Sequence, residues 1–184
     1  MIGAVILAAG SGRRMGGPKA LLRIEAETLL ERIAKAALAA GCQPVVAVVG
    51  DWGFDLGELE VQLVMNPEAA EGMASSIRTG IAALPTGMEG ALLLTVDQPA
   101  VDADLLRRLL AQFAESPTHP AACAYAGTLG IPAIFPIRLF PGLLALRGDR
   151  GAKAILLREG AMSLPFPEGA QDLDTPEDLE CFRR

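Results

Sequence analysis

The sequence predicts a three-layer α/β/α fold around a mostly parallel central sheet. Three observations favour this fold class. First, short apolar segments typical of buried strands alternate with amphipathic segments typical of helices. Second, aromatic residues are 4% of the chain and all apolar residues 51%, so aliphatic side chains must form the core. Third, the 184 residues contain no linker, repeat or low-complexity tract, which favours one domain over residues 1–184.

The predicted strands are short runs of apolar or β-branched residues. They include Val5–Leu7, Val45–Val49, Glu60–Met65 and Ala91–Val96, then two short strands within Ala121–Phe135 and a final one near Asp172. The predicted helices carry apolar residues three and four positions apart. They cover Thr28–Ala40, Ser75–Leu84, Asp102–Phe113, Leu139–Leu146, Gly151–Arg158 and a last segment from Pro176. Because right-handed crossovers align the carboxyl ends of parallel strands, the loops carrying Gly10–Lys19 and Asp97 are expected to share one ligand-binding edge.

Charge and cysteine content narrow the classes of partner. The formal net charge is −6, whereas a general binder of DNA or RNA carries a basic excess, so no nucleic-acid partner is expected. Residues 1–24 nevertheless contain four basic residues and no acidic one, which indicates one small anionic ligand bound locally. Cys42, Cys123 and Cys181 are odd in number and far apart, as expected in a reducing compartment. No apolar run reaches the ~18 residues of a membrane span, and the apolar start lacks the pattern of a signal peptide, so a cytoplasmic protein without a membrane partner is expected.

The segment from Gly10 to Lys19 is rich in glycine and in basic residues. Glycines let backbone N–H groups turn towards an anion, Arg13 can fork onto two phosphate oxygens, and Lys19 supplies a compact charge. A dinucleotide-binding fingerprint requires glycine where Met15 stands, and the phosphate loop of ATPases requires a different spacing and Ser or Thr in place of Ala20. The remaining alternative is a basic loop that is merely solvated. The glycines together with Arg13 and Lys19 favour a triphosphate site.

This region resembles the signature of small NTP transferases. The resemblance is carried by three stretches: Leu7–Gly10, Arg13–Gly16 and Pro18–Leu22. The chain is similar over nearly its whole length to the MobA-like NTP transferase family, and within it to the molybdenum cofactor cytidylyltransferase group. The further motifs that carry this resemblance, in the same order, are Glu71–Ser76, Val96–Pro99, Gly130–Pro132, Gly148–Ala152 and Asp172–Asp178. The first motif also occurs in sugar-phosphate and isoprenoid nucleotidyltransferases, whereas the later ones are similar to the cofactor branch. The resemblance implies a Rossmann-like nucleotidyltransferase fold and transfer of a nucleoside monophosphate with release of pyrophosphate.

The resemblance also implies roles for individual residues. Arg13, Lys19 and Asp97 are the expected catalytic residues. The positive charges of Arg13 and Lys19 would stabilise the leaving pyrophosphate. The expected nucleotide-binding residues lie in two loops: Leu7, Ala8, Ala9, Gly10, Gly12, Arg13 and Lys19 in the first, and Gly72, Ser75 and Ser76 in the second. Backbone groups of Leu7 and Ala8 would meet the nucleobase edge, and Ala9, where GTP-using relatives more often carry glycine, favours CTP. Ordinary helix capping is an equally good explanation of the two serines.

Asp97 directly follows a predicted buried strand. A carboxylate there is either a solvated strand end or a metal ligand, since Mg²⁺ often binds one or two carboxylates together with substrate phosphates. The resemblance assigns Asp97 to the metal, with Mg²⁺ expected and Mn²⁺ as the alternative. Asp174 is the preferred second ligand and Asp172 stays open, because alternation in an extended segment would point both to one side. Thr175 and Asp178 are predicted to form a capping box at a helix start, and this gives Glu177 and Asp178 a sufficient structural explanation.

The acceptor would lie at a third group of residues. By resemblance these are Gly130, Pro132, Asp149 and Arg150. Arg150 or Lys153 would hold the acceptor's phosphate, although a solvated helix start explains both charges equally well. The implied acceptor is the molybdopterin cofactor, with a molybdenum apo-enzyme as a further partner, and the chain would act as a monomer or a homodimer.

Three alternatives stay open at this point. A sugar or polyol phosphate would be an acceptor for the same chemistry, and GTP would be a different donor. In another functional class, a non-catalytic carrier would hold the molybdenum cofactor for an apo-enzyme, show no preference among NTPs and release no pyrophosphate. Carboxylates that bind a metal favour the enzyme, because a carrier has no use for them.

Overall fold

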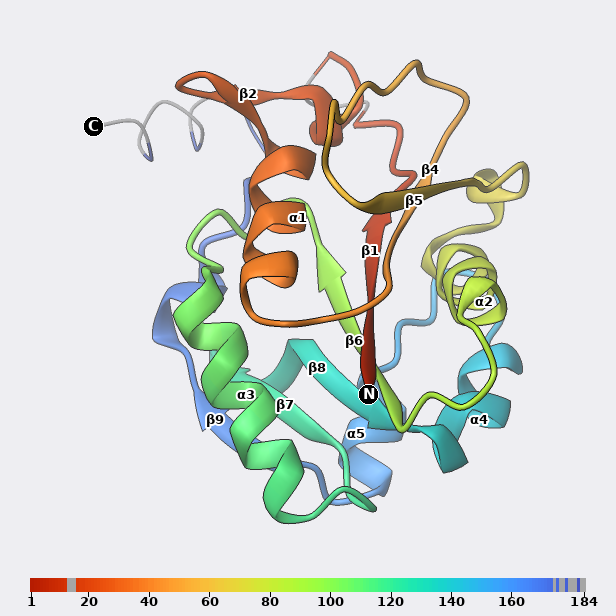
Figure 1. The fold of residues 1–184 in the computed structure, drawn as a ribbon, viewed down its shortest axis with the longest axis vertical. Coiled ribbons are helices and arrows are strands. Elements are labelled where there is room, and N and C mark those ends of the chain that lie inside the picture. Colours follow the sequence, from red (N-terminus) through yellow and green to blue (C-terminus); the bar gives the residue numbers. More distant parts are fainter. Residues whose placement is uncertain (13–15, 174, 176–177, 179–181, 183–184) are drawn as a thin grey trace.

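A seven-stranded sheet forms the centre of the molecule, in the order β5-β4-β1-β6-β8-β7-β9 (Figure 1). The computed structural model describes residues 1–12, 16–173, 175, 178 and 182. The strands of this sheet are β1 (Ile2–Ala8), β4 (Val45–Val49), β5 (Val61–Met65), β6 (Gly90–Thr95), β7 (Ala121–Tyr125), β8 (Thr128–Pro136) and β9 (Met162–Pro165). The pairs β4–β5, β1–β4, β1–β6 and β7–β9 are parallel, whereas β8 is antiparallel to both β6 and β7. The predicted fold, with a mostly parallel sheet, is confirmed.

Helices cover both faces of the sheet. On one face lie α1 (Leu29–Ala39) and α3 (Ala103–Glu115), and on the other lie α2 (Met73–Ala83), α4 (Phe140–Leu144) and α5 (Lys153–Arg158) (Figure 1). The central strand β1 contributes to both cores, since Ala4, Ile6 and Ala8 pack on the α1 side and Val5 and Leu7 on the α2 side. Successive strand residues point to opposite faces, so a strand covered on both sides must be apolar at every position.

Local side-chain hydrogen bonds set several helix starts. Thr28 and Glu31 form a reciprocal capping box at α1, and the Asp102 carboxylate accepts from the Leu105 N–H at 2.8 Å at α3. The capping box predicted for Thr175 and Asp178 is also present: the Thr175 N–H donates to Asp178 Oδ2 at 2.8 Å, and the Asp178 N–H donates to Thr175 Oγ1 at 3.3 Å. Within the described part of the chain, no helix combines the length and the apolar character that crossing a bilayer requires.

The C-terminal third contains the main corrections. The final strand predicted near Asp172 is absent, and residues 171–173 have no regular structure. Among the described residues the last strand is β9, a short edge strand whose half-buried side chains and Pro165 leave no clear strand pattern. Instead of joining a strand, Leu173 donates its N–H to the Asp97 carbonyl at 2.8 Å and buries its side chain.

Smaller differences concern element boundaries. The helix predicted over residues 139–146 is a 3₁₀ turn at Ile137–Leu139 followed by the short α4, and α5 begins at Lys153 rather than at residue 151. A two-stranded hairpin of β2 (Arg23–Ile24) and β3 (Glu27–Thr28) was not predicted; two residues per strand are too few to produce an alternation signal.

Candidate active site

The carboxyl ends of β1 and β6 carry an ion pair between residues far apart in sequence. Lys19 Nζ donates to Asp97 Oδ2 at 3.1 Å, across a separation of 78 residues. Both side chains are partly buried, with 19% of Lys19 and 29% of Asp97 exposed. The prediction that these two loops share one edge of the sheet is confirmed.

A cavity of about 690 Å³ opens beside this pair. Its volume is in the usual range for small-ligand sites of ~300–1,000 Å³. From the first predicted loop it is lined by Leu7, Ala8, Ala9, Gly10, Gly12 and Lys19. Gly72, Ser76, Asp97 and Asp149 line it from other parts of the chain. The structure thus brings together segments that the sequence analysis assigned to the nucleotide, the metal and the acceptor.

Several predicted site residues are not found at the cavity wall or cannot be placed relative to it. Arg13 and Asp174 belong to the second group, since they are outside the described residues. Ser75, Gly130, Pro132 and Arg150 are not among the residues that line the cavity. Arg150 and Lys153 are both exposed.

Gly12 lets the basic loop close on itself. Its φ is +56°, in the left-handed region, and a Cβ there would collide with the Gly17 carbonyl and lie 3.0 Å from the Lys19 nitrogen. The Gly17 N–H donates to the Gly12 carbonyl at 3.3 Å, and the chain then enters a 3₁₀ turn at Lys19–Leu21. Ala20 is buried in the core beneath this turn, so its packing holds Lys19 at the cavity.

A polar cluster lies behind Asp97. The Gln98 side chain is 5% exposed, and its Nε2 donates to the Tyr125 hydroxyl at 3.2 Å and to the Gly169 carbonyl at 3.1 Å. The Tyr125 hydroxyl in turn donates to the Ile131 carbonyl at 2.9 Å. Burial raises the pKa of Tyr125, and the negative charges of Asp172 and Asp97 act in the same direction. This cluster therefore connects the Asp97 loop to β7, β8 and the C-terminal segment.

The predicted acceptor residues Gly130 and Pro132 belong to this cluster rather than to the cavity wall. They flank Ile131, whose carbonyl accepts from Tyr125. A Cβ at Gly130 would lie 2.6 Å from Tyr125 Cζ, so only glycine lets the ring pack here. Their position near the Asp97 loop is compatible with a neighbouring acceptor, but the contacts present are internal.

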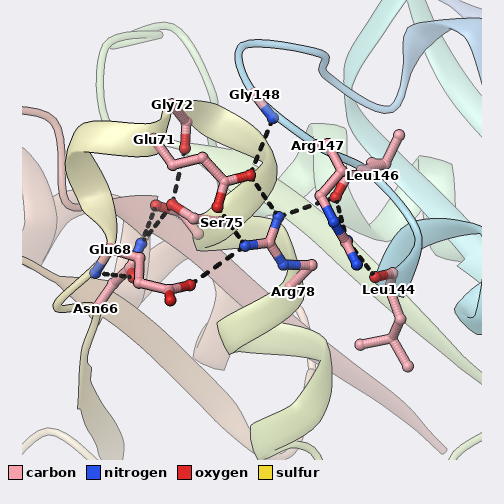
Figure 2. Close-up of polar contacts among 11 residues, drawn as sticks. Asn66, Glu68, Glu71, Gly72, Ser75, Arg78, Leu144, Leu146, Arg147 and Gly148 are labelled. Atoms are coloured by element: carbon pink, nitrogen blue, oxygen red, sulfur yellow. Dashed lines mark hydrogen bonds and ion pairs between the residues drawn. The ribbon is translucent and has the colours of Figure 1, made fainter.

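The second loop predicted to bind the nucleotide, which carries Gly72, Ser75 and Ser76, is held by a residue that the sequence analysis missed. Asn66 is 4% exposed, and its Nδ2 donates to Ser75 Oγ at 2.9 Å and to Ser76 Oγ at 3.1 Å. Ser75 Oγ donates to the Gly72 carbonyl at 2.9 Å, while Asn66 Oδ1 accepts from the Glu68 N–H at 3.0 Å (Figure 2). The hydroxyl of Ser75 is thus engaged in holding the loop. An asparagine directly after a strand, before Pro67, is the signal that could have indicated a loop-forming role.

The same loop is joined to residues 146–148 by a charged bridge (Figure 2). Arg78 pairs with Glu71 through both terminal nitrogens and with Glu68 at 3.3 Å, and it donates to the Leu146 carbonyl at 2.9 Å. Glu71 Oε1 also accepts from the Gly148 N–H at 3.0 Å. The Arg78 hydrogen bond, followed by that from Gly148, lowers the pKa of Glu71 to about 2. This bridge was not predicted, because Glu71 and Gly148 are 77 residues apart.

The carboxylates near the cavity suit a divalent cation. Asp97 presents hard oxygen donors at the cavity wall, and the hydrogen bond from Leu173 to Asp97 brings the Asp172 segment beside it. No group of three or more His, Cys, Asp or Glu side chains able to hold a metal occurs among the residues that the structure describes.

Comparisons with known proteins found a matching family model and several relatives of similar sequence. The family model for the MobA-like NTP transferase domain matches residues 4–162. Nicotine blue oxidoreductase of Paenarthrobacter nicotinovorans is 34% identical over 165 residues, which cover 83% of this chain and 79% of the relative. Molybdenum cofactor cytidylyltransferase of Escherichia coli K12 is 31% identical over 113 residues, covering 59% of this chain and 57% of the relative.

Solved structures extend the similarity to the whole fold. The crystal structure of Rv0371c from Mycobacterium tuberculosis H37Rv superposes with a TM-score of 0.81 at 28% identity, covering 100% of this chain and 97% of that one. A manganese complex of Rv0371c superposes with a TM-score of 0.76 at 27% identity, covering 98% and 96% of the two chains. Since the family match spans most of the sheet and of the cavity wall, the chain belongs to the MobA-like NTP transferase family.

Proposed function

We propose that this chain transfers CMP from CTP to the phosphate of the molybdopterin cofactor, releasing pyrophosphate in a reaction that depends on Mg²⁺. The observation that carries the proposal is the Lys19–Asp97 pair at a cavity lined by the glycine-rich loop. The similarity to the Escherichia coli molybdenum cofactor cytidylyltransferase supports the choice of donor and acceptor. The manganese complex of Rv0371c supports a divalent cation.

Phosphoryl and nucleotidyl transfer need positioning and charge neutralisation more than a covalent protein intermediate. Gly10 and Gly12 both line the cavity, and no atom lies within 4 Å of the position that a Cβ of Gly10 would take. Glycine backbones of this kind let N–H groups come close to phosphate oxygens. The Lys19 ammonium has three donor hydrogens, so it can serve both Asp97 and phosphate oxygens, and it would stabilise the charge of the leaving pyrophosphate. Arg13, in the same loop, is proposed to assist it.

Asp97, with Asp172 or Asp174, is the proposed ligand set for Mg²⁺. When bound, the ion would neutralise charge on the triphosphate and orient it for in-line attack. The chain's own contribution is to hold Asp97 in place through the Leu173 hydrogen bond and the Gln98–Tyr125 cluster. The acceptor phosphate would enter beside this loop, near β7 and β8.

The experiment is a matrix of the four NTPs against molybdopterin and a set of sugar and polyol phosphates, with Mg²⁺, reading pyrophosphate release. CTP with molybdopterin is expected to react fastest, and EDTA is expected to abolish the reaction. Faster pyrophosphate release with GTP than with CTP would make GTP the donor. Faster release with a sugar or polyol phosphate than with molybdopterin would make that phosphate the acceptor. Undiminished pyrophosphate release in EDTA would contradict metal dependence.

A second candidate activity follows from the relative named nicotine blue oxidoreductase. Oxidoreduction with a nicotinamide cofactor would need a dinucleotide site, yet the glycine-rich loop carries Met15 where the third glycine of that fingerprint belongs. Measuring the oxidation of NADH or NADPH alongside pyrophosphate release distinguishes the oxidoreductase from the nucleotidyltransferase. Oxidation without pyrophosphate release would favour the second candidate.

A further inference from the structure

The cavity wall contains a third charged side chain besides Lys19 and Asp97. Among the described lining residues, Asp149 is the remaining one with a charge. It lies against Gly72, and this part of the wall is otherwise formed by Ala69, Ala70, Met73 and the hydroxyl-bearing Ser76. A small, largely apolar surface with one carboxylate suits a flat ring that carries a hydrogen-bond donor on its edge.

The position of Asp149 is held from several sides. Gly72 has a φ of +120°, and a Cβ there would collide with Asp149 Oδ1 and lie 2.8 Å from the Gly148 carbonyl oxygen. The Ala74 N–H donates to that carbonyl at 3.1 Å, while the Gly148 N–H donates to Glu71 at 3.0 Å.

Arg78 completes the support of this loop from the other side. It joins Glu71 to the Leu146 carbonyl (Figure 2). The peptide groups on both sides of Gly148 are therefore tied to the start of α2, which carries Ser76. Asp149 and the second nucleotide loop thus form one unit.

The chemistry of a carboxylate restricts what it meets in this cavity. An ionised carboxylate accepts hydrogen bonds and donates none. The phosphates of a nucleotide carry only negative charge and acceptor oxygens, so their natural place is the Lys19 side. Of the pyrimidine bases, cytosine carries an exocyclic amino group that donates, whereas uracil and thymine carry a carbonyl oxygen at that position.

We propose that Asp149 is a specificity-determining residue: it accepts a hydrogen bond from the exocyclic amino group of the nucleobase and thereby selects CTP against UTP. This inference rests on the proposed function, because it presupposes that the cavity binds a nucleotide. Placing a carboxylate against the uracil O4 would set two acceptors against each other, which is how a polar site rejects the wrong ligand.

The test measures binding of the non-hydrolysable α,β-methylene analogues of CTP and UTP to the full chain with Mg²⁺, by calorimetry. The unmodified protein is expected to bind the CTP analogue about ten- to a hundred-fold more tightly. Asp149→Asn is expected to bring the ratio close to one, because a carboxamide both donates and accepts. Asp149→Ala is expected to lose most of the preference by weakening CTP alone, and Asp104→Asn, the same change on the exposed surface of α3, is expected to keep it.

The outcomes separate this inference from the proposed function. A preference for CTP that survives in both Asp149 variants, with unchanged thermal unfolding, overturns the inference and leaves the proposed function standing. A change in the KM of the acceptor with an unchanged CTP-to-UTP ratio also overturns it, by assigning Asp149 to the acceptor. Failure of the unmodified protein to bind either analogue overturns both.

Discussion

The two halves of the cavity wall are held together in different ways. At the ends of β1 and β6, a direct ion pair joins two side chains that both face the cavity, Lys19 and Asp97. At the start of α2, by contrast, Glu71 and Arg78 pair with each other and hold backbone groups of residues 146–148, while the cavity wall itself is mostly apolar. In the first region, Lys19 and Asp97 themselves face the cavity, whereas in the second, Glu71 and Arg78 position the backbone of the cavity wall.

This difference teaches where each kind of substitution should act. Removing a charge that faces the cavity should change the chemistry more than the stability, because Lys19 and Asp97 are both partly exposed and water screens part of their attraction. Changing a residue that supports a loop affects stability and binding together, because the backbone itself moves. The following predictions test that contrast in order of expected effect.

The largest effect is expected from Lys19→Ala. Loss of a cation that stabilises the leaving group should lower kcat by about a hundred-fold or more, by analogy with removal of one preorganised donor from an active site. Thermal unfolding should change little. Steady-state pyrophosphate release measures the first quantity and calorimetric unfolding the second. Lys35→Ala, at an exposed position on α1, is the matched control, and near-normal turnover in Lys19→Ala would remove the ion pair from the mechanism.

Gly72→Ala should act in the opposite manner. Its backbone is strained for any other residue, and its Cβ would meet the Gly148 backbone, so a destabilisation of ~1–3 kcal/mol is expected together with weaker nucleotide binding. Gly160→Ala supplies the control, since its φ is +62° but a Cβ there meets nothing within 4 Å. Chemical unfolding of both variants compares a positive-φ glycine whose Cβ would collide with one whose Cβ would not. Equal losses of stability would mean that the close approach at Gly148 contributes nothing.

Tyr125→Phe tests the cluster behind Asp97. Removing the hydroxyl deletes the bond to the Ile131 carbonyl and that from Gln98, which should cost about 1 kcal/mol of unfolding free energy. Activity should fall less than in Lys19→Ala, because the cluster supports Asp97 without meeting the ligand. Urea unfolding and kcat, measured side by side, check both statements. A fall in activity as large as that of Lys19→Ala would instead give Tyr125 a direct role in the reaction.

The smallest effect concerns the pH dependence of the Glu71–Arg78 bridge. The pKa of Glu71 falls from its usual 4.5 to about 2 in the folded chain, chiefly through Arg78. A depressed carboxyl pKa contributes stability that is present above pH 4.5 and is lost as the pH falls towards 2. The difference in stability between the unmodified chain and Glu71→Gln should therefore shrink across that window. Denaturant midpoints at several pH values measure it, with Glu115→Gln as the control for loss of one carboxylate; a difference independent of pH would contradict the bridge.

Local patterns were sufficient for much of the fold. The continuous apolar run of β1 and the spacing of α1 and α3 predicted those elements, since burial on two faces or on one face leaves a distinct periodicity. The capping box at Thr175 and Asp178 was also predictable from local sequence, because both of its hydrogen bonds join residues three positions apart. The short edge strand β9 was missed, since four residues with alternating exposure and a proline carry little periodic signal.

Within the candidate site, the sequence by itself determined which residues have the chemistry to bind an anion and a cation: Lys19 in a glycine-rich loop and Asp97 at the end of an apolar strand. Chain topology, which follows from the order of strands and helices, then made their proximity predictable. Only the tertiary structure decided which residues support them. Three arrangements depend on loops whose packing no local pattern encodes. They are the hydrogen bonds of Asn66 to two serines, the hydrogen bond of Gln98 to Tyr125, and the placement of the Asp149 loop by Glu71 and Arg78. Hydrogen bonds of that kind are set by distances of a few tenths of an ångström, which emerge only when the whole chain has folded.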